Sequence, residues 1–379
     1  MKLKQLPEDF IVEEIPICTP KQDGLYRYYL LEKRGIETLS LLNYLAKKEH
    51  IPFPAIGFAG LKDKHAITKQ YLTIPKKYTF NSLQEKNFKL SFLGFVEEPL
   101  QLGDLKENKF LITVRCLKKK DLEKISLAEG DLKAYGVLNY FDSQRFGSVI
   151  KNKFIAKHVL KEEYESAVKI FLTEYSPHEP RSKKEDKRAL AKVWPSFKDI
   201  NLSTRLYKKI IEGYIQTKSW KKAYLTIPRS LRLLHSHAYQ SYLWNECVKK
   251  IVKSVLAPKE YSSVQYAVGC LFFHKKDIIL PFSSFPLIGK ENEYTTEEKK
   301  VIDQVLTLED MHLDDFKYNE MFHTQKRDLI LKPKDFVFSI PERDECNGND
   351  QSKYFKVTLS FSLHKGSYAT LITKRLFGK

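Results

Sequence analysis

One stretch of the chain gathers polar side chains of the kind that carry out nucleophilic chemistry. It runs from Gly60 to Gln70 and reads GLKDKHAITKQ. The apolar residues before it predict a strand, which would place Asp63 just beyond a sheet end on a loop that Gly60 keeps flexible. Lys62 and Lys64 flank Asp63, and nearby cations favour the ionised carboxylate that a nucleophile needs. Asp63 is therefore the candidate catalytic residue; the alternative is a surface turn in which it caps the following segment.

The same stretch does not fit two common binding motifs. A phosphate-binding P-loop needs a glycine, four residues and then Gly-Lys-Ser/Thr, whereas Gly57 and Gly60 are three apart and Lys62 precedes an aspartate. The sequence contains no HExxH motif or comparable cluster that would give His65 further metal ligands. His65 is therefore predicted to be a hydrogen-bonded loop histidine, and no metal site is expected.

A second polar and aromatic stretch, NYFDSQRFG, covers residues 139–147. The amide of Asn139 is suited to pair with a base edge, the ring of Phe141 to stack on it, and Arg145 to bind phosphate. The alternative is that Tyr140 and Phe141 face a core beside a structural arginine. From the residues alone both interpretations stay open.

The composition indicates a polyanion as the first partner to consider. The 379 residues carry 65 Lys and Arg against 47 Asp and Glu, a formal charge of +18, together with 21 Tyr and 24 Phe. Cations interleaved with flat rings suit nucleic acid. The length predicts two or three domains and excludes a disulfide miniprotein.

The sequence predicts a cytoplasmic protein. No apolar run reaches the roughly 18 residues of a membrane span, and the first residues lack the apolar region of a signal peptide. The five scattered cysteines are predicted to be reduced and mostly buried, forming neither a disulfide framework nor a zinc site. A monomer is expected.

Hydrophobic periodicity divides the chain into three parts. Residues 1–157 alternate short strand patterns, such as 110–114, with a helix at 38–49 that Thr38 is expected to cap. Residues 158–318 have helical periodicity, which is clearest at 230–256. Residues 319–379 return to strand patterns, with regular alternation at 357–363 before a short helix that Ser367 is expected to cap. This order predicts a helical domain inserted into a mixed helix-and-sheet domain. The charged run 181–188 is predicted to be a solvated linker or loop rather than an RNA contact.

Several motifs, in order, resemble the TruD family of pseudouridine synthases. They are PEDFIVEE at 7–14, FAGLKDKHAITKQ at 58–70, LGDLK at 102–106, the stretch at 139–147, and GSYAT at 366–370. The resemblance covers the first 150 and last 60 residues well, whereas in the middle it is limited to helical character and residues 238–245. Three positions depart from the pattern: Leu138 stands where the family usually has Pro, Asp142 where it has Gly, and Tyr368 where bacterial members often have Phe.

The resemblance implies an α+β fold: a mixed, largely antiparallel sheet with flanking helices, carrying an inserted, mainly helical TRUD domain. It also implies an isomerase that converts a uridine of tRNA, at position 13 in the D arm, to pseudouridine without a cofactor or metal. Asp63 takes the position of the catalytic aspartate. Substrate-binding residues are expected as follows: Phe10, Asn139 and Tyr368 at positions that line the uridine pocket, Lys4 as the basic residue near the cleft, and Phe141 as a stacking ring.

Two other functions compete with this expectation. One is a catalytically silent RNA-binding or RNA-folding protein on the same fold, against which the joint presence of Asp63, Phe10 and Asn139 argues. The other is a basic nuclease or methyltransferase, which lacks support because the sequence shows neither a metal cluster nor a glycine-rich nucleotide loop after a strand.

Overall fold

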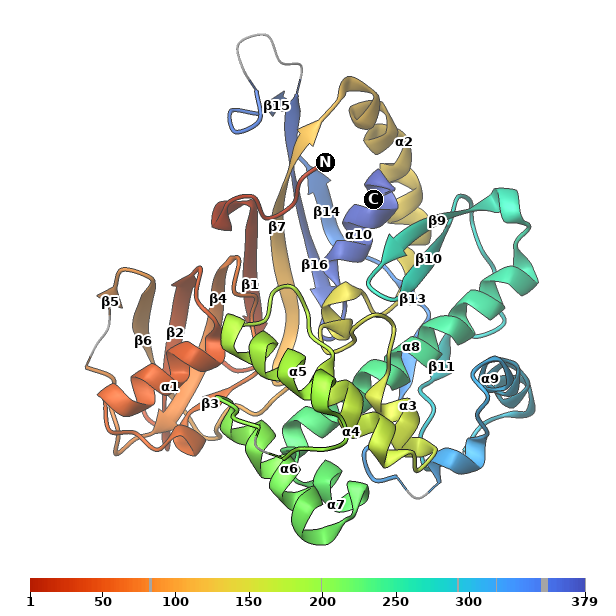
Figure 1. The fold of residues 1–379 in the computed structure, drawn as a ribbon. Helices are drawn as coiled ribbons and strands as arrows, with labels where there is room; N and C mark the ends of the chain where they lie inside the picture. The colour runs from red at the N-terminus through yellow and green to blue at the C-terminus, as the bar shows by residue number, and fades with distance from the viewer. Residues whose placement is uncertain (82–83, 199, 292, 318, 349–353, 379) are drawn as a thin grey trace. The chain divides into compact units, whose positions relative to one another are not determined.

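The described chain forms two compact units in a computed structural model that covers all residues except 82–83, 199, 292, 318, 349–353 and 379 (Figure 1). The first unit comprises Met1–Val137 and Leu331–Lys379, and the second comprises Leu138–Ile330. The chain passes between them at the short strands β8 (Val137–Leu138) and β13 (Ile330–Leu331).

The unit boundaries differ from the predicted domain boundaries. The predicted division at 157/158 lies inside the second unit, and the one at 318/319 involves residue 318, outside the described residues. The stretch after residue 138 joins the second unit because its rings pack on the long helix there: Phe141 lies edge-on to Trp244, and Phe154 lies 5.2 Å from Tyr239 between ring centroids. A change in periodicity does not reveal such contacts. That the middle segment is a TRUD domain stays a prediction.

A single ten-stranded sheet organises the first unit. Its main path runs β14-β16-β7-β1-β4-β2-β6-β5, with β15 on β16 and β3 on β4. Among the described pairs of this sheet β1 and β4 run parallel and the others antiparallel, which confirms the expected fold class. The strands are β1 (Phe10–Pro16), β2 (Tyr26–Arg34), β3 (Gly57–Phe58), β4 (Ile67–Pro75), β5 (Gln84–Glu85), β6 (Phe88–Val96), β7 (Leu105–Leu117), β14 (Lys334–Phe338), β15 (Glu342–Arg343) and β16 (Phe355–His364).

Strand β16, from the C-terminal part of the chain, pairs with β7 toward one end of this sheet. Phe361 of β16 lies opposite Phe110 of β7, and Leu359 lies opposite Ile112. These side chains share one face because residues two apart along a strand point the same way, and they are buried there. On the other face the hydroxyls of Thr113 and Thr358 lie 3.0 Å apart. The alternation predicted for both strands is confirmed.

Helices complete the first unit. They are α1 (Thr38–Lys48), α2 (Lys119–Tyr135), α10 (Ala369–Phe377) and the 3-10 turns η1 (Pro7–Asp9) and η2 (Phe53–Ala55). The apolar stripe of α1, with Leu41, Leu42 and Leu45, packs on β2 and β4 in one core cluster. The helix predicted at 38–49 is confirmed, but Glu37, not Thr38, is its N-cap, and α10 is preceded by Tyr368 rather than capped by Ser367.

The second unit is mainly helical. Its helices are α3 (Ile155–Leu160), α4 (Tyr164–Thr173), α5 (Arg181–Val193), α6 (Arg205–Thr217), α7 (Trp220–Leu225), α8 (Arg229–Val255) and α9 (Thr296–Leu308), with 3-10 turns η3 (Ser143–Phe146), η4 (Pro258–Glu260) and η5 (Leu313–Phe316). Two small antiparallel sheets accompany them: the hairpin of β9 (Tyr261–Tyr266) with β10 (Gly269–His274), and β11 (Ser284–Pro286) paired with β12 (Lys326–Asp328), which follows α9 and η5 in the chain. Helix α8 confirms the prediction for 230–256. Among the described helices, including the 27-residue α8, none has the length and apolar character needed to span a membrane.

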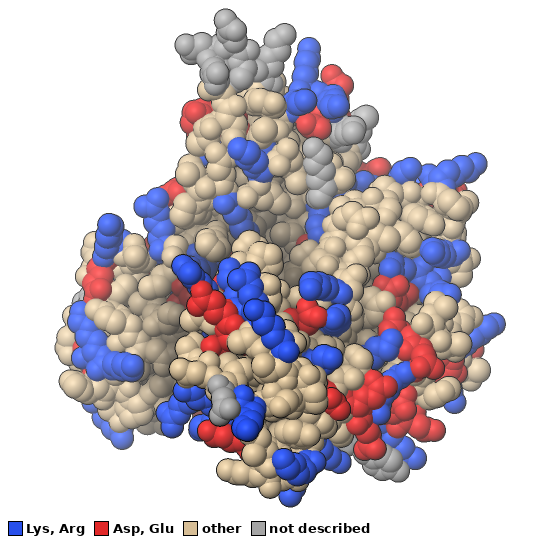
Figure 2. Space-filling model, viewed as in Figure 1, with Lys and Arg blue, Asp and Glu red and all other residues tan. Residues whose placement is uncertain are grey.

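The charged run 181–188 is helical, so the prediction of a linker or loop there was wrong. It forms the first turns of α5, over which Figure 2 shows basic and acidic side chains side by side. Two of its charges face inward: Asp186 accepts bonds from the N–H groups of Ser203 and Thr204, and Lys187 donates to the carbonyl of Glu174. Buried Leu190 completes the inward face. Because residues 181–188 contain no apolar side chain, hydrophobic periodicity does not reveal the helix there.

The cysteines are free, as expected, but they are not mostly buried. Cys247 is buried and Cys346 is exposed, while the other three are half-buried.

Candidate active site

The loop that carries Asp63 joins β3 to β4 and is held by side chains from three neighbouring elements. The N–H of Lys62 donates to the hydroxyl of Thr38 at the start of α1 (3.1 Å). Gln70 of β4 donates to the carbonyl of Gly60 (3.4 Å), and Lys33 of β2 donates to the carbonyl of Asp63 itself (2.9 Å). Thr38 thus fastens the loop rather than capping its helix. These bonds fix the backbone on both sides of Asp63.

Lys4 supplies the cation that contacts Asp63. Its ammonium donates to Oδ2 of Asp63, and the same ammonium lies 4.0 Å from the ring centroid of Phe10. Phe10 is buried and packs edge-on against Phe110 of β7. The structure therefore brings together three of the predicted site residues, Lys4, Phe10 and Asp63.

Asp63 is held in its ionised form. Burial alone would raise the pKa of its carboxyl, but the bond from Lys4 and the N–H of His65, which donates to Oδ1 (3.3 Å), outweigh burial. The pKa of Asp63 consequently lies below its ordinary value. The side chain keeps 21% of its surface exposed, so the carboxylate stays accessible. A charged, partly exposed carboxylate fixed by a cation is suited to nucleophilic attack.

Lys4, rather than the flanking Lys62 and Lys64, is the lysine that lowers the pKa of Asp63. Lys62 turns away from Asp63 and pairs with Glu14 of β1 at 2.6 Å, where both side chains are nearly buried. Burial raises the pKa of Glu14, although Lys62 opposes the rise. Adjacency in sequence did not predict the pairing because the cation that reaches Asp63 comes from 59 residues away.

Lys33 is a buried cation beneath the loop that sequence reasoning missed. It is 1% exposed and donates to the carbonyls of Asp63 and Ile36, both at 2.9 Å. Burial lowers its pKa to about 8, although the charge of Asp63 opposes the shift. No local pattern marks a lysine as buried, because strands at a sheet surface routinely carry exposed lysines.

Lys33 should make the protein more stable as the pH rises from about 8 to about 10.5. The folded-state pKa is about 8, and the unfolded chain titrates at about 10.4. Between these values the unfolded chain binds more protons, so the free energy of unfolding rises with pH, by up to about 3 kcal/mol. Urea denaturation at a series of pH values should show a flatter profile for Lys33→Met. The exposed-lysine control Lys89→Met should keep the wild-type slope; equal slopes for wild type and Lys33→Met would contradict the assignment.

Tyr368 lies in the same unit as Asp63. It is half-buried at the junction between β16 and α10, where its carbonyl accepts the N–H of Leu371. Its proposed place in the uridine pocket stays a prediction.

Asn139 belongs to the second unit, where an arginine and the backbone of β12 hold its amide. Its Nδ2 donates to the carbonyl of Asp328 (3.0 Å), and its Oδ1 accepts from Arg327 (2.6 Å). The Arg327 guanidinium also lies 4.3 Å from the ring centroid of Phe141. Arg327 therefore positions two predicted site residues at once, and sequence reasoning missed it because it lies 188 residues from Asn139.

Phe141 is fixed in the core of the second unit. Its N–H donates to Oδ1 of Asn245 in α8, and its carbonyl accepts from Nδ2 of the same side chain. Phe141 is 5% exposed and Tyr140 is fully buried. Both rings therefore face a core, as the alternative interpretation of this stretch predicts. The proposed stacking role of Phe141 stays a prediction.

The two departures from the family pattern at Leu138 and Asp142 are accommodated locally. Asp142 is 2% exposed and is the N-cap of η3, where its carboxylate accepts from the N–H of Ser143 (2.7 Å). Its φ of −99° is open to any residue, so an aspartate can stand where the family usually has glycine. Leu138 is buried in β8.

Within the described part of the chain, no group of three or more His, Cys, Asp or Glu side chains is placed to hold a metal ion.

Comparison with known proteins decides the family. The model of the family described as tRNA pseudouridine synthase D (TruD) matches residues 1–267 and 274–376. The chain belongs to the TruD family. Members of this family are pseudouridine synthases, and hence isomerases, so the predicted resemblance is confirmed.

Individual TruD relatives match over nearly the whole chain. A probable tRNA pseudouridine synthase D 2 from Methanocaldococcus jannaschii is 42% identical and covers 100% of this chain and 92% of its own length. The tRNA pseudouridine synthase D of Aquifex aeolicus is 30% identical, and the match covers 100% of this chain and 98% of the relative. The crystal structure of a putative TruD protein from Methanosarcina mazei superimposes with a TM-score of 0.72 at 26% identity. The match covers 100% of this chain and 93% of that protein.

Proposed function

We propose that this protein is a tRNA pseudouridine synthase that isomerises uridine 13 in the D arm with Asp63 as its nucleophile. The observation that carries the proposal is the state of Asp63: in the long TruD motif, it is an accessible carboxylate kept ionised by Lys4 and fixed through its backbone by Lys33. A surface turn with a capping aspartate would need neither cation.

The reaction needs a group that helps to break a carbon–nitrogen bond. The bond between N1 of the base and C1′ of the ribose breaks, a bond between C5 and C1′ forms, the proton leaves C5, and N1 gains a proton. Asp63 would attack C6 of the base or C1′ of the sugar, or assist elimination of the base. No electrons are exchanged and no group is imported, so the chemistry requires no cofactor.

The proposed partner is tRNA. The relatives from Methanocaldococcus jannaschii and Aquifex aeolicus carry that substrate in their names. The formal charge of +18 suits a polyanion, and Figure 2 shows lysine and arginine side chains distributed over the drawn face of both units. Within this proposal the target base leaves its stack, which costs a few kcal/mol, and aromatic side chains recover part of the cost. Tyr368, Phe10 and Phe141 are the candidate rings, and Asn139 is the candidate amide for the base edge.

Tritium release from a tRNA transcript labelled at C5 of uridine tests the proposal, because isomerisation frees that hydrogen while the mass of the nucleoside stays unchanged. Wild-type protein should release tritium, and carbodiimide labelling should place the product at position 13. A transcript with cytidine at position 13 is the matched control and should release none. Release from another position would correct the site while keeping the activity.

The alternative is a protein that binds or folds RNA without chemistry. Tight tRNA binding combined with no tritium release from any transcript would favour it and overturn the proposed activity.

Binding to tRNA should weaken steeply with salt. Lysine and arginine side chains that neutralise phosphates release counterions, so the logarithm of affinity falls linearly with the logarithm of salt concentration. We expect the Kd to rise about tenfold or more between 50 and 200 mM salt, measured by filter binding. A Kd that stays constant over this range would contradict a phosphate-binding surface.

A further inference from the structure

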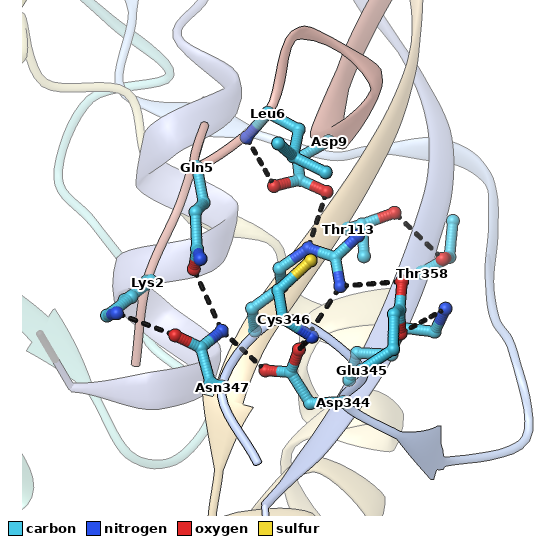
Figure 3. Close-up of polar contacts among 12 residues, drawn as sticks. Lys2, Gln5, Leu6, Asp9, Thr113, Asp344, Glu345, Cys346, Asn347 and Thr358 are labelled. Atoms are coloured by element: carbon cyan, nitrogen blue, oxygen red, sulfur yellow. Dashed lines mark hydrogen bonds and ion pairs between the residues drawn. The ribbon is translucent and has the colours of Figure 1, made fainter. Parts of the chain in front are cut away.

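A buried guanidinium in the first unit binds three carboxylates outside the proposed chemistry. Arg115 of β7 is 5% exposed, and its Nε donates to Oδ1 of Asp9 at 2.7 Å. Its Nη1 donates to Asp344 (3.2 Å) and to Glu345 (3.1 Å). Asp9 and Asp344 are themselves 1% and 3% exposed. Figure 3 shows the polar contacts of this cluster. Burying these charges is energetically costly, which suggests that the cluster has a function beyond packing.

The cluster fastens the N-terminal segment on both sides of Lys4. Before Lys4, the backbones of Lys2 and Arg115 exchange two hydrogen bonds, at 2.8 and 3.0 Å. After Lys4, the N–H of Leu6 donates to Oδ2 of Asp9 (2.9 Å), the carboxylate whose other oxygen binds Arg115.

Asn347 ties the same segment to the cluster from the C-terminal part of the chain. Its Oδ1 accepts from Lys2 (2.6 Å), and its Nδ2 donates both to Gln5 (2.8 Å) and to Asp344 (2.8 Å). Figure 3 shows these side chains pointing toward one another. The residues flanking Lys4 are therefore anchored, while the Lys4 side chain reaches Asp63.

Between these two anchored positions, the backbone of Lys4 has an unusual conformation. Its φ is +53°, in the left-handed region. A lysine there costs on the order of 1 kcal/mol, and such a residue persists where its surroundings determine its conformation. From this backbone the ammonium meets Asp63 and the face of Phe10.

We infer that Asp9, Arg115 and Asn347 are positioning residues, which act on the reaction by holding Lys4 against Asp63. This inference rests on the proposed function of Asp63. The charged or titratable groups that face Asp63 are Lys4, His65 and Lys33, and among them Lys4 donates a side-chain hydrogen bond to the carboxylate. Loosening Lys4 should therefore raise the pKa of Asp63 toward its ordinary value.

A double-mutant cycle tests the inference, with Asn347→Ala and Asp9→Asn each made in the wild-type and the Lys4→Met backgrounds. In the wild-type background we expect kcat for tRNA to fall about 3- to 30-fold with KM little changed, and the acid limb of the kcat profile to move to higher pH. In the Lys4→Met background the same changes should have almost no further effect, because residues that act through one another are not additive. Asn43→Ala removes an exposed asparagine of α1 whose Nδ2 donates to the carbonyl of Leu39 in the same helix, and this control should behave as wild type.

Two outcomes overturn the inference. One is an equal loss of kcat in both backgrounds, which would indicate a general structural role. The other is an unchanged acid limb in Asn347→Ala together with normal activity. A direct measurement of the pKa of Asp63 distinguishes failure of this inference from failure of the proposed function. It uses NMR of protein labelled at the aspartate carboxyl carbons, with the Asp63 signal assigned from Asp63→Asn. If wild type shows no turnover while Asn347→Ala still raises the pKa of Asp63, the proposed function falls and the positioning of Lys4 stands.

Discussion

Replacing Asp63 with asparagine should lower pseudouridine formation by at least about 1,000-fold, the scale seen when a nucleophile is removed. The amide keeps the shape of the side chain but lacks the ionised oxygen that the reaction needs. Because the substitution removes a negative charge, it should leave binding of a polyanion unchanged or slightly tighter. Single-turnover tritium release measures the first effect, and filter binding of tRNA measures the second.

Asp23→Asn is the matched control for this prediction. Asp23 is exposed and pairs with Lys76 on the surface of the same unit, so its replacement should leave turnover at the wild-type rate. Turnover by Asp63→Asn at a rate comparable to wild type would remove Asp63 from its assigned role.

Replacing Arg115 with methionine should destabilise the protein by about 3–5 kcal/mol, because it leaves the buried carboxylates of Asp9 and Asp344 without their cation. Thermal unfolding followed by circular dichroism should show the melting temperature falling by about 6–20 °C.

Arg34→Met is the matched control for the stability prediction. Arg34 forms an exposed ion pair with Glu8, and exposed pairs contribute about 1 kcal/mol or less. Equal melting temperatures for Arg115→Met and Arg34→Met would show that the carboxylates around Arg115 do not need a buried partner.

Much of the fold was predictable because it depends on local periodicity. The apolar stripe of α1, the long pattern of α8 and the alternation along β16 each report which face of an element is buried, and the structure confirms them. The charged start of α5 and the unit boundary near residue 138 were not predictable in this way. In both places polar hydrogen bonds or contacts distant in sequence decide where the segment belongs.

The sequence alone determined the family and pointed to Asp63, because an ordered set of motifs requires no knowledge of contacts. Only the tertiary structure decided which charges meet. It replaced Lys62 with Lys4 as the cation on Asp63, placed Lys33 beneath the loop, and joined Arg115 to an aspartate 229 residues away. The energy of an ion pair depends on the distance between its charges and on their burial, and the tertiary fold, rather than the order of residues along the chain, sets both.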